Sequence, residues 1–177
     1  MLKTLIHGPK LDNLLLMADR VRRVPGCIVE FGVYHGGTLQ LLAERFPDRQ
    51  CFGFDTWEGL PAESWTEGEP HGIGDFRDCD FEAVRDGMPA NVELRRGRFP
   101  ETAAGIDGPI ALAHVDFDWE RSTADAIEWL RPRLAPGGIA VFDDYEWKHC
   151  PGVKAAIERA GIPVLQSTNH QVYWVNA

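Results

Sequence analysis

Glu30-Phe31-Gly32-Val33-Tyr34-His35-Gly36-Gly37 is the stretch of sequence that decides the fold. An apolar run from Cys27 to Val33 leads into it, and an amphipathic pattern from Thr38 to Phe46 follows it at once. An apolar strand that turns through glycines into the N-terminus of a helix is how an open α/β sheet holds a cofactor. The alternative is a tight strand-to-helix turn that binds no ligand, since short glycine motifs also occur by chance.

The chemistry of this loop favours one kind of cofactor over another. Its glycines, Gly32 and the pair Gly36 and Gly37, do not follow the G-x-G-x-x-G spacing of dinucleotide-binding loops. Glu30 lies two residues before the first glycine, and its carboxylate repels a pyrophosphate but not a cation. The loop therefore favours a nucleoside with a positive centre, such as S-adenosylmethionine, over a dinucleotide.

Length and charge limit the classes of protein to which the chain can belong. Its 177 residues, of which 44% are hydrophobic, predict one domain spanning residues 1–177 with a full core. The net charge of -9 argues against nucleic acid or an anionic membrane as a partner, because both bind basic patches. We therefore expect the partner to be a small molecule.

The cysteines and the apolar runs indicate the cellular compartment. The four cysteines show neither a C-x-x-C pair nor zinc spacing; they are Cys27, Cys51, Cys79 and Cys150. Residues 1–10 lack the apolar core of a signal peptide, and no apolar run is long enough to span a bilayer. These features predict a reduced, cytoplasmic protein.

Strand and helix patterns alternate along the chain. This alternation predicts an α/β fold with a mostly parallel, doubly wound sheet, to which a C-terminal hairpin adds an antiparallel edge. The expected strands are 27–33, 51–55, 91–96, 109–115 and 139–142, followed by a hairpin of 163–166 and 171–175. The expected helices are 11–21, 38–46, one that reaches Leu134 from a capping box at 122–125, and one that Pro151 opens.

The segment from Thr56 to Asp78 is irregular and rich in glycine and proline. Loops of this length are usually covers of active sites or disordered segments. Its aromatic residues Trp57, Trp65 and Phe76 favour a cover that packs on the rest of the protein.

Asp55 ends the second strand, at the edge of the sheet where α/β proteins bind ligands. A carboxylate there suits the ribose of a nucleoside, because it can accept hydrogen bonds from both hydroxyl groups. The alternative is that Asp55 only caps the turn that follows it.

Two further strand ends carry clusters of acids. One strand ends in Asp116 and Asp118, and the next ends in Asp143 and Asp144. Neighbouring strands lie about 4.8 Å apart, so these carboxylates converge and repel one another unless a positive charge lies between them. We expect Asp116, Asp143 and Asp144 to hold Mg²⁺, which prefers oxygen ligands. We expect Asp118 to face solvent or cap a helix, and the same position is the alternative for Asp144.

Three other polar or aromatic residues have two interpretations each. His114 lies inside an apolar strand and is expected to be a hydrogen-bonded core histidine rather than a ligand. His35 lies in the glycine loop, where it either contacts the cofactor or faces solvent. Trp119 follows the strand-end acids and either contacts the substrate or starts a helix.

Several segments together carry a resemblance to a known family. They are Val24 to Val33 with Gly36 and Gly37, Phe54 to Pro61, Gly74 to Phe76, Gly97 to Thr102, Val115 to Asp118, Pro136 to Gly138, and Phe142 to Tyr145. In these segments the chain resembles the macrocin O-methyltransferase (TylF/MycF-like) family of class I S-adenosylmethionine-dependent methyltransferases. The resemblance implies the Rossmann-like class I methyltransferase fold and Mg²⁺-assisted methyl transfer to a hydroxyl of a small molecule, typically a sugar on a natural product.

The resemblance also implies roles for individual residues. Asp116, Asp143 and Asp144 take the positions of the family's metal ligands, and Asp116 is in addition the expected catalytic base. The cofactor contacts fall on Glu30, Gly32, Tyr34, Gly36, Gly37, Asp55, Thr56 and Phe99. Members of the family also suggest a homodimer, although this chain is shorter than they are and Trp119 stands where they commonly have tyrosine.

Two other functions compete with methyl transfer. A nicotinamide-dependent oxidoreductase is consistent with Asp55 but not with Glu30 or the glycine spacing. A non-catalytic S-adenosylmethionine-binding module leaves the strand-end acids without a role, although clustering them costs electrostatic free energy.

Overall fold

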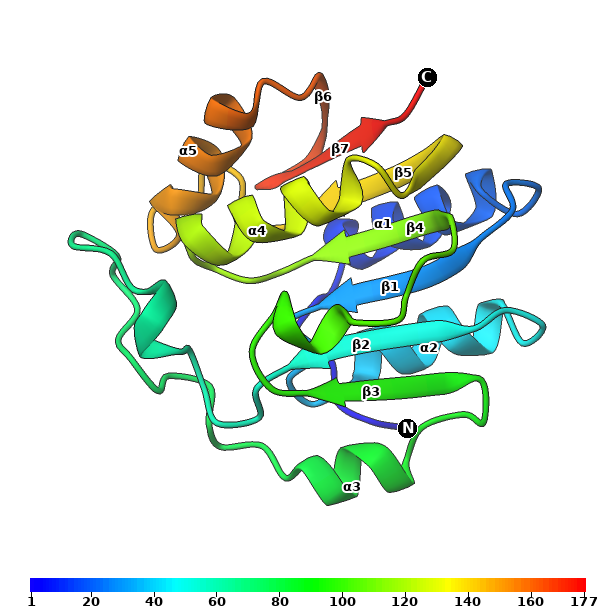
Figure 1. The fold of residues 1–177 in the computed structure, drawn as a ribbon, viewed down its shortest axis with the longest axis horizontal. Coiled ribbons are helices and arrows are strands. Elements are labelled where there is room, and N and C mark those ends of the chain that lie inside the picture. Colours follow the sequence, from blue (N-terminus) through cyan, green and yellow to red (C-terminus); the bar gives the residue numbers. More distant parts are fainter.

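The computed structural model describes all residues from 1 to 177 and contains one seven-stranded sheet (Figure 1). Its strands lie in the order β3-β2-β1-β4-β5-β7-β6, and β7 alone runs antiparallel to its neighbours. Their bounds are β1 Cys27–Phe31, β2 Cys51–Asp55, β3 Val92–Arg96, β4 Ile110–Val115, β5 Leu134–Phe142, β6 Val164–Thr168 and β7 Gln171–Val175. The mostly parallel sheet with a C-terminal antiparallel hairpin confirms the fold class predicted from the sequence.

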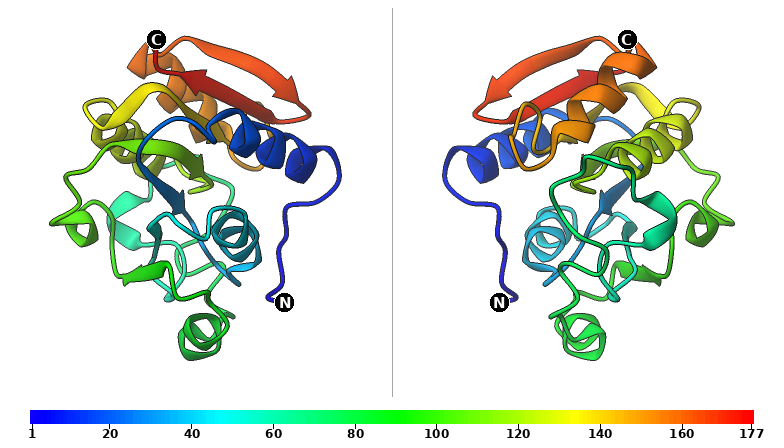
Figure 2. Two further views of the ribbon diagram at one scale, coloured as in Figure 1. Left: turned by 90° about the vertical axis from the view of Figure 1, so that its right-hand side faces the viewer. Right: turned by 90° about the vertical axis from the view of Figure 1, so that its left-hand side faces the viewer.

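Helices cover both faces of the sheet, as Figure 2 shows edge-on. Helices α1 (Pro9–Arg20) and α2 (Gly37–Arg45) lie on one face, and α4 (Glu120–Leu130) and α5 (Pro151–Ala160) lie on the other. The short α3 (Phe81–Asp86) lies beside the β3 edge, and two single turns, η1 (Ala62–Ser64) and η2 (Glu101–Ala103), interrupt the loops. None of these helices combines the length and the apolar character that crossing a membrane requires.

The central strands are buried on both faces because apolar side chains alternate between two cores. Val29 and Phe31 of β1 pack into the core under α4 and α5, whereas Ile28 packs into the core under α1 and α2. All six residues of β4 are buried. Such continuous apolar strands are typical of parallel sheets with helices on both faces.

The expected helix after β4 differs at both ends. No capping box forms at Ser122, because α4 starts at Glu120 and the carboxylate of Glu69, from the long loop, accepts the hydrogen bond of Glu120 N at 3.0 Å. The helix ends at Leu130 instead of Leu134, since Leu134 already pairs with Ile110 in the sheet. Trp119 is the fully buried residue that precedes the helix, so it starts the helix, which is the second of its two interpretations.

The C-terminal hairpin is confirmed. Strands β6 and β7 pair antiparallel, and β7 pairs with β5, so that the hairpin completes the sheet. The chain reverses at Asn169 and His170, and His170 has the left-handed φ of 56°. All four cysteines are free, as the absence of paired spacing predicts.

The glycines of the loop after β1 permit close approach within the protein itself. A Cβ on Gly32, whose φ is +85°, would lie 2.0 Å from the carbonyl oxygen of Asp116 on the neighbouring chain segment. A Cβ on Gly37 would lie 2.4 Å from the carbonyl carbon of Lys3. Gly36, with φ +81°, faces Met88 and Val84 instead of the strand ends. Close packing within the protein, against backbone at Gly32 and Gly37 and against side chains at Gly36, therefore accounts for these glycines independently of any ligand.

Replacing Gly32 by alanine is expected to destabilise the protein by about 3 kcal/mol, because the new methyl group forces β1 and β4 apart in addition to the backbone strain. Gly105→Ala is the matched control, since Gly105 has nearly the same φ (+80°) but no atom within 4 Å of the added Cβ. The control should lose only the strain, about 1 kcal/mol. Urea unfolding measures both values, and equal losses would contradict the steric explanation.

Candidate active site

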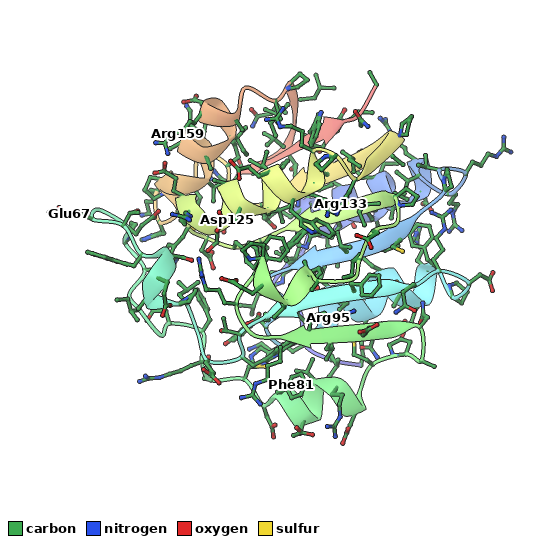
Figure 3. The ribbon with its side chains drawn as sticks, viewed as in Figure 1. Glu67, Phe81, Arg95, Asp125, Arg133 and Arg159 are labelled. Carbon is green, nitrogen blue, oxygen red and sulfur yellow. The ribbon has the colours of Figure 1, made fainter.

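A cavity of about 350 Å³ opens at the carboxyl ends of the central strands. Ligands of α/β proteins bind at this edge of the sheet. The loop from Thr56 to Asp78 borders the cavity with Leu60, Ser64, His71 and Phe76, which confirms that it is a cover. Its tip at Glu67 projects away from the sheet (Figure 3). Residues 3–6 near the N-terminus line the cavity as well.

Asp55 faces this cavity and caps the backbone around it. Its Oδ2 accepts a hydrogen bond from Tyr34 N at 2.8 Å, and its Oδ1 accepts one from Trp57 N at 2.9 Å. Burial raises the pKa of Asp55, and these backbone hydrogen bonds oppose that rise. Each carboxylate oxygen has a second lone pair, so capping leaves Asp55 able to accept hydrogen bonds from a ribose. The two interpretations of Asp55 are thus compatible.

Glu30 and His114 form a buried pair beside the same cavity. His114 Nδ1 lies 2.8 Å from Glu30 Oε1, and both side chains are 1% exposed. Burial raises the pKa of Glu30, although the hydrogen bond with His114 opposes this. Burial alone would lower the pKa of His114, but the carboxylates of Asp143 and Glu30 raise it to about 10. His114 is therefore a cationic, hydrogen-bonded core histidine, while Glu30 Oε2 is buried without a hydrogen-bond partner.

The strand-end acids converge as expected, but Asp118 joins the expected trio of Asp116, Asp143 and Asp144. Carboxylate oxygens of Asp116, Asp118 and Asp144 lie within 4.8 Å of one another. Asp143 is buried, and its Oδ2 lies 3.8 Å from His114 Nε2, so it joins Asp116 from the side of the core. The expectation that Asp118 faces solvent is wrong, because the left-handed turn at Asp118 (φ 61°) brings its side chain to the cavity.

Lys10 supplies part of the positive charge that the acids require. Its Nζ lies 2.5 Å from Asp143 Oδ1 and 2.8 Å from Asp144 Oδ1. Burial would lower the pKa of Lys10, but its attraction to Asp143 and Asp144 raises it. Burial would raise the pKa of Asp143, but His114 and, to a smaller extent, Lys10 lower it. The sequence led us to expect a metal ion as the only positive charge between the acids. Lys10 shows that the protein itself also supplies one.

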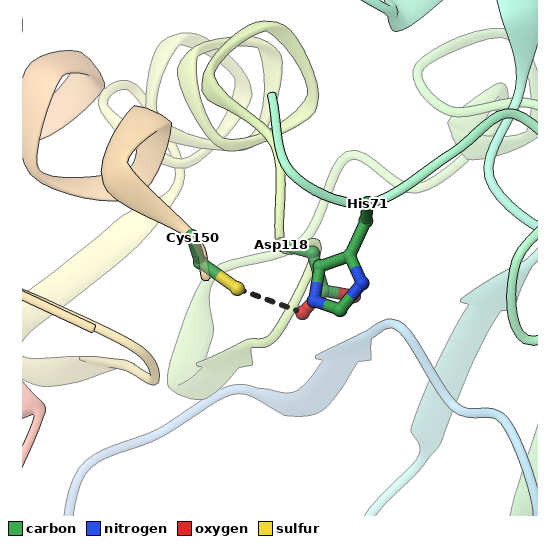
Figure 4. Close-up of side chains that lie close together, drawn as sticks. All are labelled: His71, Asp118 and Cys150. Atoms are coloured by element: carbon green, nitrogen blue, oxygen red, sulfur yellow. Dashed lines mark hydrogen bonds between the residues drawn. The ribbon is translucent and has the colours of Figure 1, made fainter. Parts of the chain in front are cut away.

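Asp116 and Asp118 have no cationic side chain at ion-pair distance. Burial, followed by the charges of Asp143 and Asp144, raises the pKa of Asp116 well above its usual range. Burial and then the charge of Asp144 raise the pKa of Asp118 to about 7. Cys150 Sγ lies 3.4 Å from Asp118 Oδ1, and Figure 4 shows the ring of His71 beside the same carboxylate.

The donor set fits a hard divalent cation. Asp116, Asp118, Asp143 and Asp144 offer only oxygen atoms, as Mg²⁺ prefers. Asp143 Oδ2 is buried and has no hydrogen-bond partner, which leaves it free for a further ligand. The acids outnumber the two cationic side chains beside them, Lys10 and His114, so a divalent cation would relieve the burial and repulsion that raise the pKa values of Asp116 and Asp118.

The other residues expected at the cofactor divide into two groups. Tyr34, Gly37, Thr56 and Phe99 line the cavity together with Gly32, whereas Gly36 does not and faces α3. His35 also lines the cavity. Lys10 could not be predicted as a site residue from the sequence, because no local pattern links it to Asp144, 134 residues away. Asp118 had a signal, its position two residues after Asp116 at the end of a buried strand.

The loops that follow the four central strands share a backbone feature. Tyr34 after β1, Trp57 after β2, Asp118 after β4 and Asp144 after β5 all have φ between 49° and 61°. This left-handed conformation costs free energy in residues other than glycine and is concentrated at functional sites. These loops therefore form one strained rim around the cavity.

Comparisons with known proteins agree with a nucleoside-binding α/β enzyme. A family described as "Methyltransferase domain" matches residues 29–145. The chain is 31% identical, over 97% of its length and 74% of the relative, to 8-demethyl-8-(2,3-dimethoxy-alpha-L-rhamnosyl)-tetracenomycin-C 4'-O-methyltransferase of Streptomyces olivaceus.

Two solved structures are similar along nearly the whole chain. The O-methyltransferase NovP superposes with a TM-score of 0.83 at 27% identity, covering 98% of this chain and 82% of NovP. CalS11, a TDP-rhamnose 3'-O-methyltransferase of calicheamicin biosynthesis, superposes with a TM-score of 0.68 at 26% identity, covering 93% of this chain and 78% of CalS11.

Fold and site thus define a nucleoside-dependent transferase of the Rossmann-like class. The chain belongs to the methyltransferase-domain family. Its reaction class is O-methyl transfer from S-adenosylmethionine, and the nicotinamide-dependent alternative finds no support among these relatives.

Replacing Asp55 by alanine should weaken binding of S-adenosylhomocysteine at least about tenfold, or 1.4 kcal/mol, because the ribose loses its acceptor and the loop loses two backbone caps. Asp55→Asn is the matched control, since it keeps an acceptor oxygen and the shape of the side chain and should lose less. Isothermal titration measures both, and native affinity in Asp55→Ala would refute the role in ribose binding.

Proposed function

We propose that the protein methylates a hydroxyl group of a sugar carried by a natural product, and that it lies in the macrocin O-methyltransferase branch of the family. The observation that carries this proposal is the cluster of strand-end acids at the wall of the cofactor cavity. Two of the similar proteins act, by their names, on molecules that contain rhamnose. Rhamnosyl groups are therefore the first acceptors to test.

The cavity offers complementary groups to both ends of S-adenosylmethionine. Asp55 would accept hydrogen bonds from the ribose, and Phe99 and Thr56 line the wall beside it. Glu30 Oε2, buried and without a partner, would accept a hydrogen bond from the amino group of the methionine end. A carboxylate at this position favours the cationic cofactor, because it is charge-complementary to both the ammonium and the sulfonium groups.

Asp116, Asp143 and Asp144 are the residues that would hold Mg²⁺. When bound there, Mg²⁺ would lower the pKa of the acceptor hydroxyl. Asp118 is a better candidate for the base than Asp116, the residue expected from the sequence, because both line the cavity but Asp116 would be engaged as a ligand of the metal. The chain itself contributes alignment of the acceptor oxygen with the methyl group, which alone supplies several kcal/mol.

The acceptor would enter beside Trp147. This side chain and Lys10 line the main cavity and also a second, more open cavity of about 250 Å³. The second cavity offers hydrogen-bonding side chains from Thr168, Asn169 and His170. An indole face with polar groups around it suits a sugar ring, which has apolar C–H faces and a hydroxylated edge.

A methyl-donor assay tests the proposed function. We expect labelled methyl transfer from S-adenosylmethionine to methyl α-L-rhamnoside and to TDP-rhamnose, lost with EDTA and restored by Mg²⁺. The neutral rhamnoside is the informative acceptor, because it has no diphosphate that could itself require Mg²⁺. Full turnover in EDTA would refute the metal, and failure with every sugar acceptor would refute the acceptor class.

A set of asparagine variants should distinguish the roles of the acids in metal binding and in turnover. Asp143→Asn should weaken Mg²⁺ binding, because it removes a charge at nearly constant shape. Asp118→Asn should lower kcat by about 10²–10⁴, as expected for loss of a base, while it weakens Mg²⁺ binding less than Asp143→Asn does and leaves the affinity for S-adenosylhomocysteine within a few-fold of the native value. Asp116→Asn should impair both metal binding and turnover.

Asp125→Asn is the control for these variants, since Asp125 pairs with Arg121 on α4 and does not line the cavity. It should retain native turnover. If Asp118→Asn also retains native turnover, Asp118 is not the base, and the role returns to Asp116.

A further inference from the structure

Lys10 occupies a position that no pattern in the sequence assigns to it. Its ammonium group contacts Asp143 Oδ1 at 2.5 Å and Asp144 Oδ1 at 2.8 Å, and its side chain is 24% exposed. These two carboxylates also belong to the proposed metal site. One pair of acids thus serves two different cations.

The two cations are not independent. Mg²⁺ binds carboxylate oxygens at about 2.0–2.1 Å. An ammonium group that stays at hydrogen-bond distance from the same two carboxylates would lie within a few ångströms of the ion, where their like charges repel strongly. Whichever cation is bound therefore weakens the binding of the other.

We propose that Lys10 is a built-in counter-cation of the Asp143 and Asp144 pair, and that a divalent metal ion displaces its ammonium group on binding. This inference rests on the metal site of the proposed function. Lysine has a flexible four-carbon stem, so the ammonium group can move while the backbone of α1 stays in place. The second cavity, which Lys10 lines together with His7 and Trp147, offers space for the displaced group.

Displacement of Lys10 would also affect the cofactor cavity, because residues 3–6, which precede Lys10, form part of the wall of that cavity. Lys3 O accepts a hydrogen bond from Gly37 N at 3.0 Å, and the hydroxyl groups of Thr4 and Thr38 lie 2.6 Å apart. Lys10 lies in the first turn of α1, directly after this segment. Its contact with the acids is thus one of the links that hold the N-terminal segment against the active site.

Binding of Mn²⁺ to the full chain, followed by electron paramagnetic resonance without S-adenosylmethionine or acceptor, tests the inference. Lys10→Met should bind Mn²⁺ at least tenfold more tightly than the native protein, because the competing charge is gone. Lys10→Arg should stay within threefold of the native affinity, since it keeps the charge. Lys3→Met is the matched control: Lys3 lines the same cavity but forms no ion pair, so its effect measures the general loss of one charge.

Three results would overturn the inference. They are equal or weaker Mn²⁺ binding in Lys10→Met, an equal gain in Lys3→Met, and no Mn²⁺ binding in any of the proteins. Titration with S-adenosylhomocysteine verifies that each variant is folded, and Lys10→Gln, which keeps a hydrogen bond to one acid, replaces Lys10→Met if that variant is unfolded. The methyl-donor assay reports separately on the proposed function, so native turnover with unchanged Mn²⁺ affinity in Lys10→Met would reject this inference alone.

Discussion

The burial of several carboxylates at one edge of the sheet is the constraint on which the rest of the structure depends. A buried charge without a partner is costly, and removing one member of a buried ion pair typically costs about 3–5 kcal/mol. This protein links Glu30 to His114, His114 to Asp143, and Asp143 to Lys10. The resulting chain of charges runs from β1 through β4 and β5 to α1. Holding the acids in place therefore also fixes strands β1, β4 and β5 and the N-terminal helix α1 relative to one another.

The long loop from Thr56 to Asp78 is tied to the same acidic region by contacts of two of its residues, Glu69 and His71. Glu69 accepts the hydrogen bond of Glu120 N, so a residue of the loop caps the helix that follows the acids. A negative group at a helix N-terminus is stabilising, because the unpaired N–H groups there carry partial positive charge. Two residues later, His71 lies beside Asp118. Movement of this loop would thus change both the end of α4 and the surroundings of a proposed catalytic residue.

The sequence predicted the fold well because its main signals are local. An apolar run such as that of β4 favours a buried strand, and turn residues such as those of the hairpin favour a chain reversal, in almost any sequence context. Both elements formed where expected. The capping box at Ser122 failed for the opposite reason. A local motif competed with Glu69, a residue 51 positions away that reaches the helix only in the folded chain, and tertiary contact decided where the helix starts.

The candidate site was predicted less completely, because sequence position fixes which strand end a residue occupies but not where its side chain points. Asp116, Asp143 and Asp144 do lie at neighbouring strand ends, yet Asp143 turns to His114 and Lys10, and Asp118 turns to the cavity. The left-handed backbone at Asp118 and Asp144 produces this division. On one side of the cluster, Asp143 and Asp144 are paired with Lys10. On the other side, Asp116 and Asp118 line the cavity without a cationic partner at ion-pair distance. An acceptor hydroxyl would meet the acids on that second side, whereas a metal ion held by Asp116, Asp143 and Asp144 would bridge the two sides and bring positive charge to the acceptor oxygen.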